Sequence, residues 1–417
     1  MTEQRPSSRR PRARNVAIIA LLILVGLSLA FLSTAPSVDV PSRPAAEDIA
    51  AARDLARTLR ESQLSGTPVK LELDARQIGA LGLLAGEAAG LRRVETELGG
   101  DIFSARASLP AGGGLWINAA ATMSGTHQGF PTIHLKVGRV PLPAVASRWA
   151  IDIARWLLVK KGVQLPTPDK VVRHFEVAGN RVGVELALPQ NTGIVKRVVS
   201  VAGANVDHAL AARIYCRLAQ AQPAGETPQL ATLVRQTFRG AGGTNPAAYN
   251  RAAFVALAFY VVGEQAYPLA LEAADRSRSC PAPAATVLLQ ERDDLAKHWA
   301  FSAALAAVLG EQRASSLGEW KELHDSLPSG SGFSFVDLAA DRSGLHVARG
   351  ALDPGSAGSV GQTLKTASDE DLLPEILTQA PEGLSDVEFT DSFGGLDENR
   401  YRDAVSLIDR HLAHWRP

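Results

Sequence analysis

Segments with the alternating apolar pattern of strands occur in this chain only before about residue 204, and this limit constrains its possible folds more than any other feature. Before it, VKLEL at 69–73 and TIHLKV at 132–137 alternate apolar and polar residues, as half-buried strands do. The segments HFEV and VGVEL flank a Gly-Asn pair that suits a tight hairpin turn. Because short helical stretches separate these strands, we expect residues 47–203 to form an α+β domain with an antiparallel sheet.

After residue 204 the alternating segments end, and Ala/Leu-rich stretches with helical periodicity replace them. Residues 252–262 are apolar on every side. This run is too short to cross a bilayer, so we expect it to be the central helix of a bundle. Residues 204–417 should therefore form a mainly α-helical domain.

The N-terminus has the pattern of a membrane anchor. Residues 1–14 carry five arginines and one acidic residue, and residues 16–32 are apolar except for Gly26 and Ser28. A helix over 15–33 would span a thin bilayer at about 1.5 Å per residue. The positive-inside rule would keep residues 1–14 in the cytoplasm. A cleaved signal peptide is the alternative, because the sequence Ser-Thr-Ala that begins at residue 33 suits a cleavage site.

The predicted fold class is thus α+β with an N-terminal transmembrane helix, followed by an antiparallel-sheet domain and a mainly α-helical C-terminal domain. A Pro/Ser-rich linker at 34–46 would join the helix to the body. We expect a single-pass protein of the bacterial inner membrane whose body lies in the periplasm.

The chain has two cysteines, Cys216 and Cys280. In an oxidising compartment they should form a disulfide, although two separate buried thiols are an alternative. Lys plus Arg equals Asp plus Glu, 43 each, so the composition does not point to a nucleic-acid partner. The sequence holds no Gly-rich phosphate loop, zinc-protease H-E-x-x-H or esterase G-x-S-x-G motif, and we predict no cofactor.

Charged residues recur at helical spacing in an otherwise apolar region between residues 294 and 341. Residues three or four apart lie on one face of a helix, and antiparallel helices joined by short turns would bring such faces together. The charged side chains fall on three successive helices, the first with Asp294 and His298, the second with Glu319, Lys321, Glu322 and Asp325, and the third, capped by Ser334, with Asp337 and Asp341.

Such a cluster suits general acid–base chemistry. Carboxylates gathered in a partly dry space repel one another, so at least one should keep its proton near neutral pH. Glu322 would then donate a proton to a glycosidic bond, and Asp337 or Asp341 would act as base or charge stabiliser. His298 with Asp294 would orient and tune these acids.

The remaining charges would complete the candidate catalytic site. Lys321 and Arg342 would set its charge balance, and Glu319 and Asp325 would lie on the same face as Glu322. Two other interpretations stay open. The same charges can form an interhelical polar network that only fixes helix register, or, with His298, a site for a divalent metal.

The region 291–348 also resembles a known family. The matching positions keep both residue type and spacing: Asp294, His298, Ser302, Leu305, Ser316, Leu317, Gly318, Lys321, Glu322, Leu323, Asp325, Ser326, Gly330, Ser331, Gly332, Ser334, Asp337, Asp341 and Gly344. They resemble the YfiM-type family of small bacterial envelope lipoproteins of unknown function. This chain departs from the family at Leu295, where the family usually has lysine, and by its N-terminal apolar segment in place of a lipidated cysteine.

The resemblance implies an envelope location and a module whose polar residues belong together, but it supplies no reaction. We expect a membrane-anchored periplasmic protein that cleaves peptidoglycan or another envelope polysaccharide, by hydrolysis or by a lyase reaction. The alternative is a non-catalytic envelope assembly or scaffold protein. The expected partners are the inner membrane, an envelope glycan and envelope proteins, with no nucleic acid.

Overall fold

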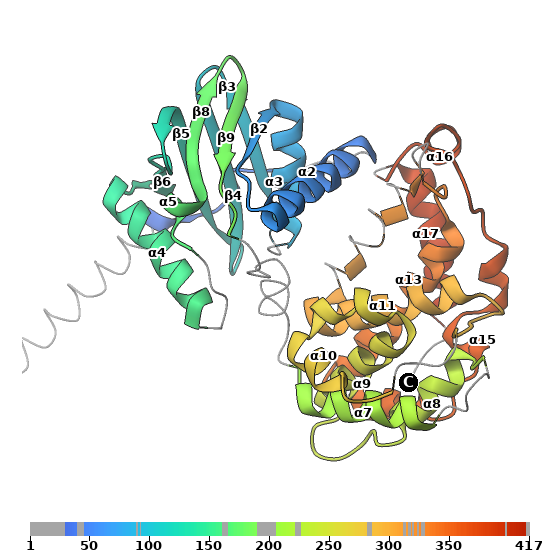
Figure 1. The fold of residues 1–417 in the computed structure, drawn as a ribbon. Coiled ribbons are helices and arrows are strands. Elements are labelled where there is room, and N and C mark those ends of the chain that lie inside the picture. Colours follow the sequence, from blue (N-terminus) through green and yellow to red (C-terminus); the bar gives the residue numbers. More distant parts are fainter. Residues whose placement is uncertain are drawn as a thin grey trace, which may run out of the picture. The chain divides into compact units, whose positions relative to one another are not determined.

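The structure is a computed structural model, and it describes residues 30–39, 46–88, 91, 93–160, 166–189, 206–221, 227–281, 286–311, 314–315, 318, 321–322, 325–326, 330–396 and 398–413. The chain divides into two compact units. A sheet unit takes in residues 1–41, 65–154 and 167–188, and a helical unit takes in residues 42–64, 155–166 and 189–417 (Figure 1).

The sheet unit is built on one antiparallel sheet, as the sequence predicts. Its main strands follow the spatial order β2 (Val69–Asp74), β9 (Arg181–Leu186), β8 (Val172–Ala178), β5 (Leu115–Gln128), β4 (Ile102–Gly112) and β3 (Val94–Gly99). The long strand β5 also pairs with β1 (Leu32–Ser33) and β6 (His134–Val137), and β6 pairs with β7 (Val140–Pro141). The predicted hairpin is β8–β9, whose turn residues Gly179 and Asn180 both have positive φ, at 57° and 64°.

Helices accompany this sheet. They are α3 (Ala75–Ala88), the first part of α4 (Ala144–Lys160), which continues into the helical unit from residue 155, and α5 (Pro168–Val171). Five buried apolar side chains form a small cluster: Ile78, Leu98, Phe175, Val177 and Val182. Helix α3 supplies the first of these, because its Gly82 lets the helix approach β3 closely: a Cβ there would meet Thr96 Cγ2 at 2.6 Å.

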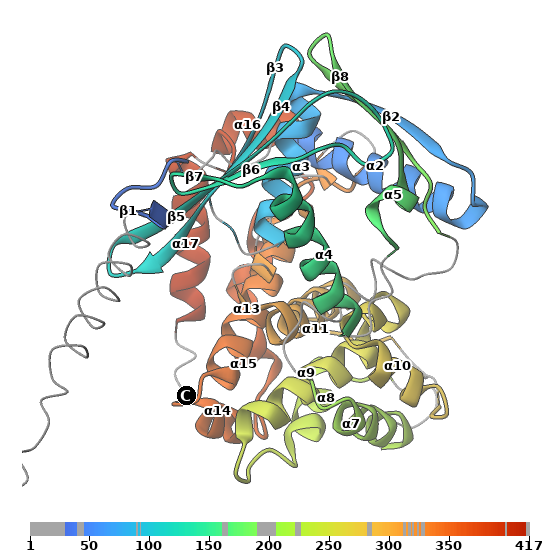
Figure 2. The same cartoon turned by 90° about the vertical axis from the view of Figure 1, so that its left-hand side faces the viewer.

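The helical unit has a much larger core. Its α-helices are α7 (His208–Ala221), α8 (Leu230–Phe238), α9 (Pro246–Val261), α10 (Leu271–Ser277), α11 (Asp293–Leu309), α13 (Phe335–Leu352), α14 (Ala357–Thr363), α15 (Asp369–Leu372), α16 (Asp386–Phe393) and α17 (Asn399–Leu412) (Figure 2). Single 3₁₀ turns lie at Gly263–Gln265, Tyr267–Leu269 and Glu375–Gln379, and α2 (Ala46–Ser65) precedes the first long strand in the sequence. As predicted, α9 is the central helix, since the side chains from 252 to 260 are all buried.

Helices α11 and α13 pack closely against each other. Gly344 makes this possible, because a Cβ at that position would lie 2.3 Å from the backbone oxygen of Trp299. Ser334 caps α13 by accepting a hydrogen bond from the Asp337 N–H at 3.0 Å, as the sequence predicts. The close contact brings the charged faces of the two helices together.

The predicted disulfide is confirmed. Cys216 in α7 and Cys280, which follows α10, are bonded with their Cα atoms 5.3 Å apart. The bond closes a loop with a sequence separation of 64 residues and ties α7 to the residues that follow α10.

The predicted fold class was wrong in its N-terminal transmembrane helix. Among the described residues, no helix has the length and apolar character needed to cross a membrane. Leu32 and Ser33, at the end of the expected span, form strand β1 and pair with Ile117 and Trp116 of β5. Their backbone groups therefore find hydrogen-bond partners in the sheet. Residues 1–29, which hold the rest of the expected anchor and the basic tail, lie outside the described residues, as do residues 40–45 of the expected linker.

Candidate functional site

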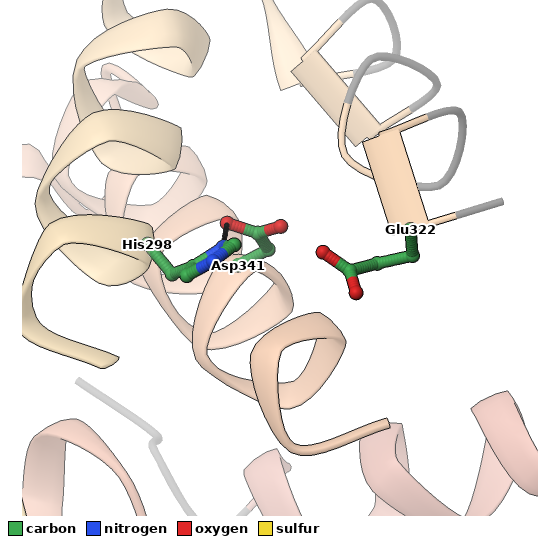
Figure 3. A group of neighbouring side chains, drawn as sticks. All are labelled: His298, Glu322 and Asp341. Carbon is green, nitrogen blue, oxygen red and sulfur yellow. Dashed lines mark hydrogen bonds and ion pairs between the residues drawn. The ribbon is translucent and has the colours of Figure 1, made fainter. Parts of the chain in front are cut away.

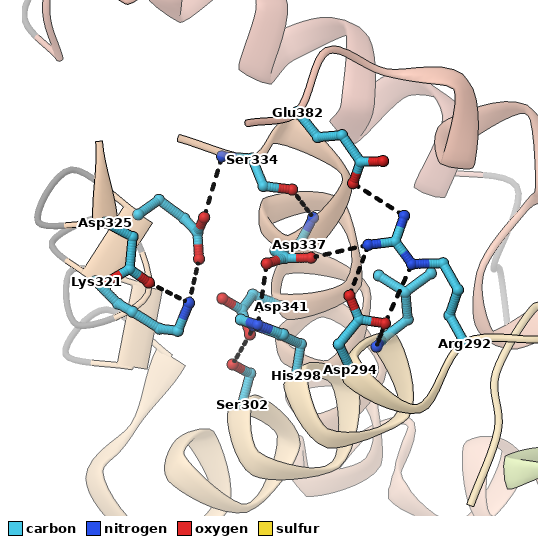
Figure 4. A network of polar contacts seen from close by, with 12 residues as sticks. Arg292, Asp294, His298, Ser302, Lys321, Asp325, Ser334, Asp337, Asp341 and Glu382 are labelled. Carbon is cyan, nitrogen blue, oxygen red and sulfur yellow. Dashed lines mark hydrogen bonds and ion pairs between the residues drawn. The ribbon is translucent and has the colours of Figure 1, made fainter. Parts of the chain in front are cut away.

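The candidate site lies where three segments of the helical unit meet (Figure 4). Helix α11 supplies His298 and Ser302, and α13 supplies Asp337 and Asp341 one turn apart. The segment between these helices supplies three more predicted residues, Lys321, Glu322 and Asp325. Six of the eight predicted site residues thus come together: His298, Lys321, Glu322, Asp325, Asp337 and Asp341. Glu319 lies outside the described residues.

His298 bridges the two acids of α13. Its Nδ1 lies 3.1 Å from Oδ1 of Asp341, and its Nε2 lies 3.3 Å from Oδ2 of Asp337. Burial lowers the pKa of His298, but the charges and hydrogen bonds of Asp341 and Asp337 outweigh it and raise the pKa to about 11. Both ring nitrogens can then donate at once. The ring is therefore a fixed cation held between the two aspartates.

Asp341 is buried beneath this contact and faces Glu322. Its Oδ1 also accepts a hydrogen bond from Ser302 Oγ at 2.6 Å. Figure 3 shows the second carboxylate oxygen of Asp341 directed toward the carboxyl group of Glu322. Gly318 leaves room for this oxygen, since a Cβ there would lie 3.0 Å from it. Two carboxyl groups that face each other in a dry space cannot both be ionised without cost.

Glu322 is the carboxyl group of the site that keeps its proton near neutral pH. It is 0% exposed, its Oε1 lies 2.8 Å from Lys321 Nζ, and its Oε2 accepts a hydrogen bond from the Ser334 N–H at 3.1 Å. Burial raises the pKa of Glu322 and Lys321 lowers it; with the added repulsion of Asp337 and Asp341, the pKa is about 7. Glu322 therefore gains and loses its proton near neutrality.

Lys321 holds Glu322 and Asp325 together. Its Nζ lies 2.8 Å from an oxygen of each carboxyl group. Burial lowers the pKa of Lys321, but the two acids outweigh burial and raise it above its ordinary value. Lys321 is thus a permanent cation on the side of the site opposite His298.

Asp294 and Arg342 take other partners than those expected. Asp294 pairs with Arg292, with Oδ2 to Nη2 at 2.6 Å and Oδ1 to Nε at 3.1 Å. Although burial acts in the opposite direction, these bonds hold the pKa of Asp294 below its usual value. Arg342 forms a two-pronged pair with Asp409 of α17, at 2.7 and 2.6 Å.

Sequence reasoning missed Arg292 and Glu382. Arg292 Nη1 lies 2.9 Å from Glu382 Oε2, and its Nη2 lies 3.8 Å from Asp337 Oδ1. Arg292 therefore links Asp294, Asp337 and Glu382 at the outer edge of the site. Its place two residues before Asp294 at the start of α11 was a signal in the sequence, whereas nothing local to Glu382 suggested a link across 90 residues.

The inner residues also offer atoms to a metal ion. One ligand atom each of His298, Glu322 and Asp341 lie within 4.8 Å of one another. One nitrogen and two oxygens suit a divalent cation of the first transition row. The two cations already at this point, His298 and Lys321, compete with such an ion for the same carboxylates.

Comparison with known proteins found no matching family model, curated protein or solved structure.

Proposed function

We propose that the helical unit carries a general acid–base site with Glu322 as the proton donor, and that the protein cleaves a glycan of the bacterial envelope. The single observation that carries the chemistry is the buried carboxyl group of Glu322, whose pKa is about 7, facing Asp341. A carboxyl group that is protonated beside an ionised one is the pairing that glycoside cleavage requires.

Each charged neighbour has a role in this scheme. Asp341 acts as the base or stabilises positive charge that develops on the sugar, and His298 holds the Asp341 carboxylate in place. Lys321 orients Glu322 and limits the rise of its pKa. An oxygen of Glu322 and one of Asp341 lie within 4.8 Å of each other. Inverting enzymes hold their carboxyl groups about 6.5–9.5 Å apart, so this spacing favours a retaining hydrolase or a lyase.

An extracytoplasmic location is part of the proposal. The Cys216–Cys280 disulfide supports it, because such bonds persist in oxidising compartments. The resemblance of residues 291–348 to envelope lipoproteins points the same way. The glycan substrate rests on the location and on the acid–base chemistry together, and peptidoglycan is the first substrate to test.

One observation favours a second function, that of a non-catalytic envelope assembly or scaffold protein. Glu322 is 0% exposed, and both of its oxygens have partners within the protein. A closed polar network of this kind can serve only to fix the register of α11 and α13. Catalysis requires the segment that carries Glu322 to open when substrate binds.

The experiment that separates these functions compares the full-length wild type, Glu322→Gln and the exposed control Glu375→Gln. Each is incubated with peptidoglycan sacculi, and soluble fragments are identified by mass spectrometry. Release by the wild type and the control, but not by a normally melting Glu322→Gln, is the expected result. Fragments one water lighter than hydrolysis products would identify a lyase. If no variant releases fragments and Glu322→Gln has a lowered melting temperature, the scaffold function is supported and the glycan-cleaving function is rejected.

A further inference from the structure

Helix α4 carries a row of large apolar side chains that remains in solvent. Five of them are between 40% and 66% exposed: Val145, Trp149, Ile153, Trp156 and Val159. Their spacings of four, four, three and three residues place them along one face of the helix. Both ribbon views show α4 leading away from the sheet rather than lying along it (Figure 1 and Figure 2).

The first part of α4, residues 144–154, belongs to the sheet unit and contacts it through side chains outside the apolar row. Ser147 is buried, and the guanidinium of Arg148 lies over the ring of Phe130, 5.5 Å from its centroid. Arg148 also forms a two-pronged pair with Asp169 of α5. These contacts fix the rotation of α4 about its axis, and in this rotation the apolar row is exposed.

The part of the sequence that contains this row has an excess of positive charge. Residues 134–174 contain eight Lys or Arg and two Asp or Glu, a net charge of +6 by subtraction, in a chain with 43 of each sign. Both acids, Asp152 and Asp169, contact Arg148. The exposed basic side chains of this segment include Lys136, Arg139, Lys170 and Arg173.

An anionic lipid surface matches both features. Tryptophan concentrates at the boundary between membrane and water, because its ring is apolar and its N–H is polar. A helix with a broad apolar face and flanking Lys and Arg lies in the plane of that boundary. Clusters of basic residues add attraction to anionic headgroups. The central part of a protein–protein interface is instead poor in charge.

We propose that the apolar face of α4 docks in the plane of an anionic lipid surface, with Trp149 and Trp156 at the level of the headgroups. The basic residues of 134–174 supply the electrostatic attraction, and the row from Val145 to Val159 supplies the buried apolar area. This inference is independent of the acid–base site, since α4 carries none of its residues.

The test is hydrogen exchange of the full-length chain, read by mass spectrometry on peptides that cover 144–160. The readout is local, so contacts that other segments make with a vesicle do not affect it. Vesicles of phosphatidylglycerol and phosphatidylethanolamine should slow exchange in α4 about tenfold or more. Vesicles of phosphatidylcholine should slow it much less, because they lack the negative charge.

A matched pair of variants completes the test. Trp149→Gln/Trp156→Gln should lose the slowing, whereas Ile376→Gln/Val387→Gln, which removes two apolar side chains as exposed in the helical unit, should keep it. Unchanged exchange in β8 and β9 shows that a variant is folded. The proposal is overturned if anionic vesicles leave α4 of the wild type unchanged, or if the tryptophan variant is slowed equally. It is also overturned if α4 exchanges as slowly as α9 without vesicles, which would mean that protein covers this face.

Discussion

His298 in α11 lies with its Nδ1 3.1 Å from Oδ1 of Asp341 in α13, and the same ring contacts Asp337 one turn away. The imidazolium is therefore a cation, 12% exposed, that joins α11 to α13 by contacting two aspartates at once. Breaking a buried ion pair by removing one partner leaves the other charge without compensation, which is far more damaging than losing a surface pair.

Replacing His298 by Gln should destabilise the helical unit by about 3 kcal/mol or more at pH 6. The pKa of His298 is raised to about 11, from an unfolded value of 6.5. Its stabilising effect is thus complete below about pH 6.5 and is lost as the pH rises toward 11. Guanidinium unfolding, followed by circular dichroism at 222 nm, should show a smaller gap between wild type and variant at pH 9 than at pH 6.

The control for this prediction is His134→Gln, which changes an exposed histidine of the sheet unit and should leave the unfolding of the helical unit unchanged. A gap between wild type and His298→Gln that stays constant from pH 6 to pH 9 would mean that folding does not raise the pKa of His298. The neutral ring present above about pH 6.5 could then donate a hydrogen bond to Asp337 or to Asp341, but not to both.

Gly344→Ala should force α11 and α13 apart. The added Cβ would lie 2.3 Å from the Trp299 backbone oxygen, and backbone cannot move aside as the end of a side chain can. Overpacking of this kind costs about 1–3 kcal/mol. Gly350→Ala in the same helix meets only a methyl group of Val360, at 3.2 Å, and should change stability by less than about 1 kcal/mol. Equal thermal melts for the two variants would contradict the close contact at Gly344.

The sequence could predict which residues share a helix face, but not which neighbours they meet. Spacings of three and four were sufficient to place His298, Asp337 and Asp341 on inward faces. The same rule paired Asp294 with His298. In the structure Asp294 lies in the first turn of α11, and Arg292, which has an extended backbone just before the helix, pairs with it instead. Local pattern does not encode such end geometry.

Contacts between distant segments were beyond local rules as well. Arg342 pairs with Asp409 of α17 across 67 residues, and the full burial of Glu322 depends on what covers it. The transmembrane helix predicted from the N-terminal apolar run was wrong for a related reason. Hydropathy alone cannot show that Leu32 and Ser33 would find partners in β5.

Removing the disulfide should weaken the helical unit substantially. The bond closes a loop with a separation of 64 residues, which in the chain-entropy model stabilises by about 4 kcal/mol. The double variant Cys216→Ala/Cys280→Ala should show this loss in denaturant unfolding. Dithiothreitol should lower the stability of the wild type to the level of the variant and leave the variant unchanged. If dithiothreitol leaves the stability of the wild type unchanged, and this stability equals that of the variant, the thiols are not bonded in solution.

Glu322→Gln should reveal the shifted pKa of Glu322 without any assay of activity. Burial first, then the charges of Asp337 and Asp341, raise that pKa from 4.5 to about 7 against the effect of Lys321. Between these two values the unfolded chain releases a proton that the folded protein retains, so the wild type loses stability as the pH rises. Gln does not titrate, and the stability of the variant relative to the wild type should therefore increase by about 3 kcal/mol from pH 4.5 to pH 7 and then level off. Urea unfolding at half-unit pH steps measures the difference, with Glu375→Gln as the flat control. If the variant instead loses relative stability as the pH rises, Lys321 controls the carboxyl group, and Glu322 is an ionised member of a structural ion pair that has no proton to donate at neutral pH.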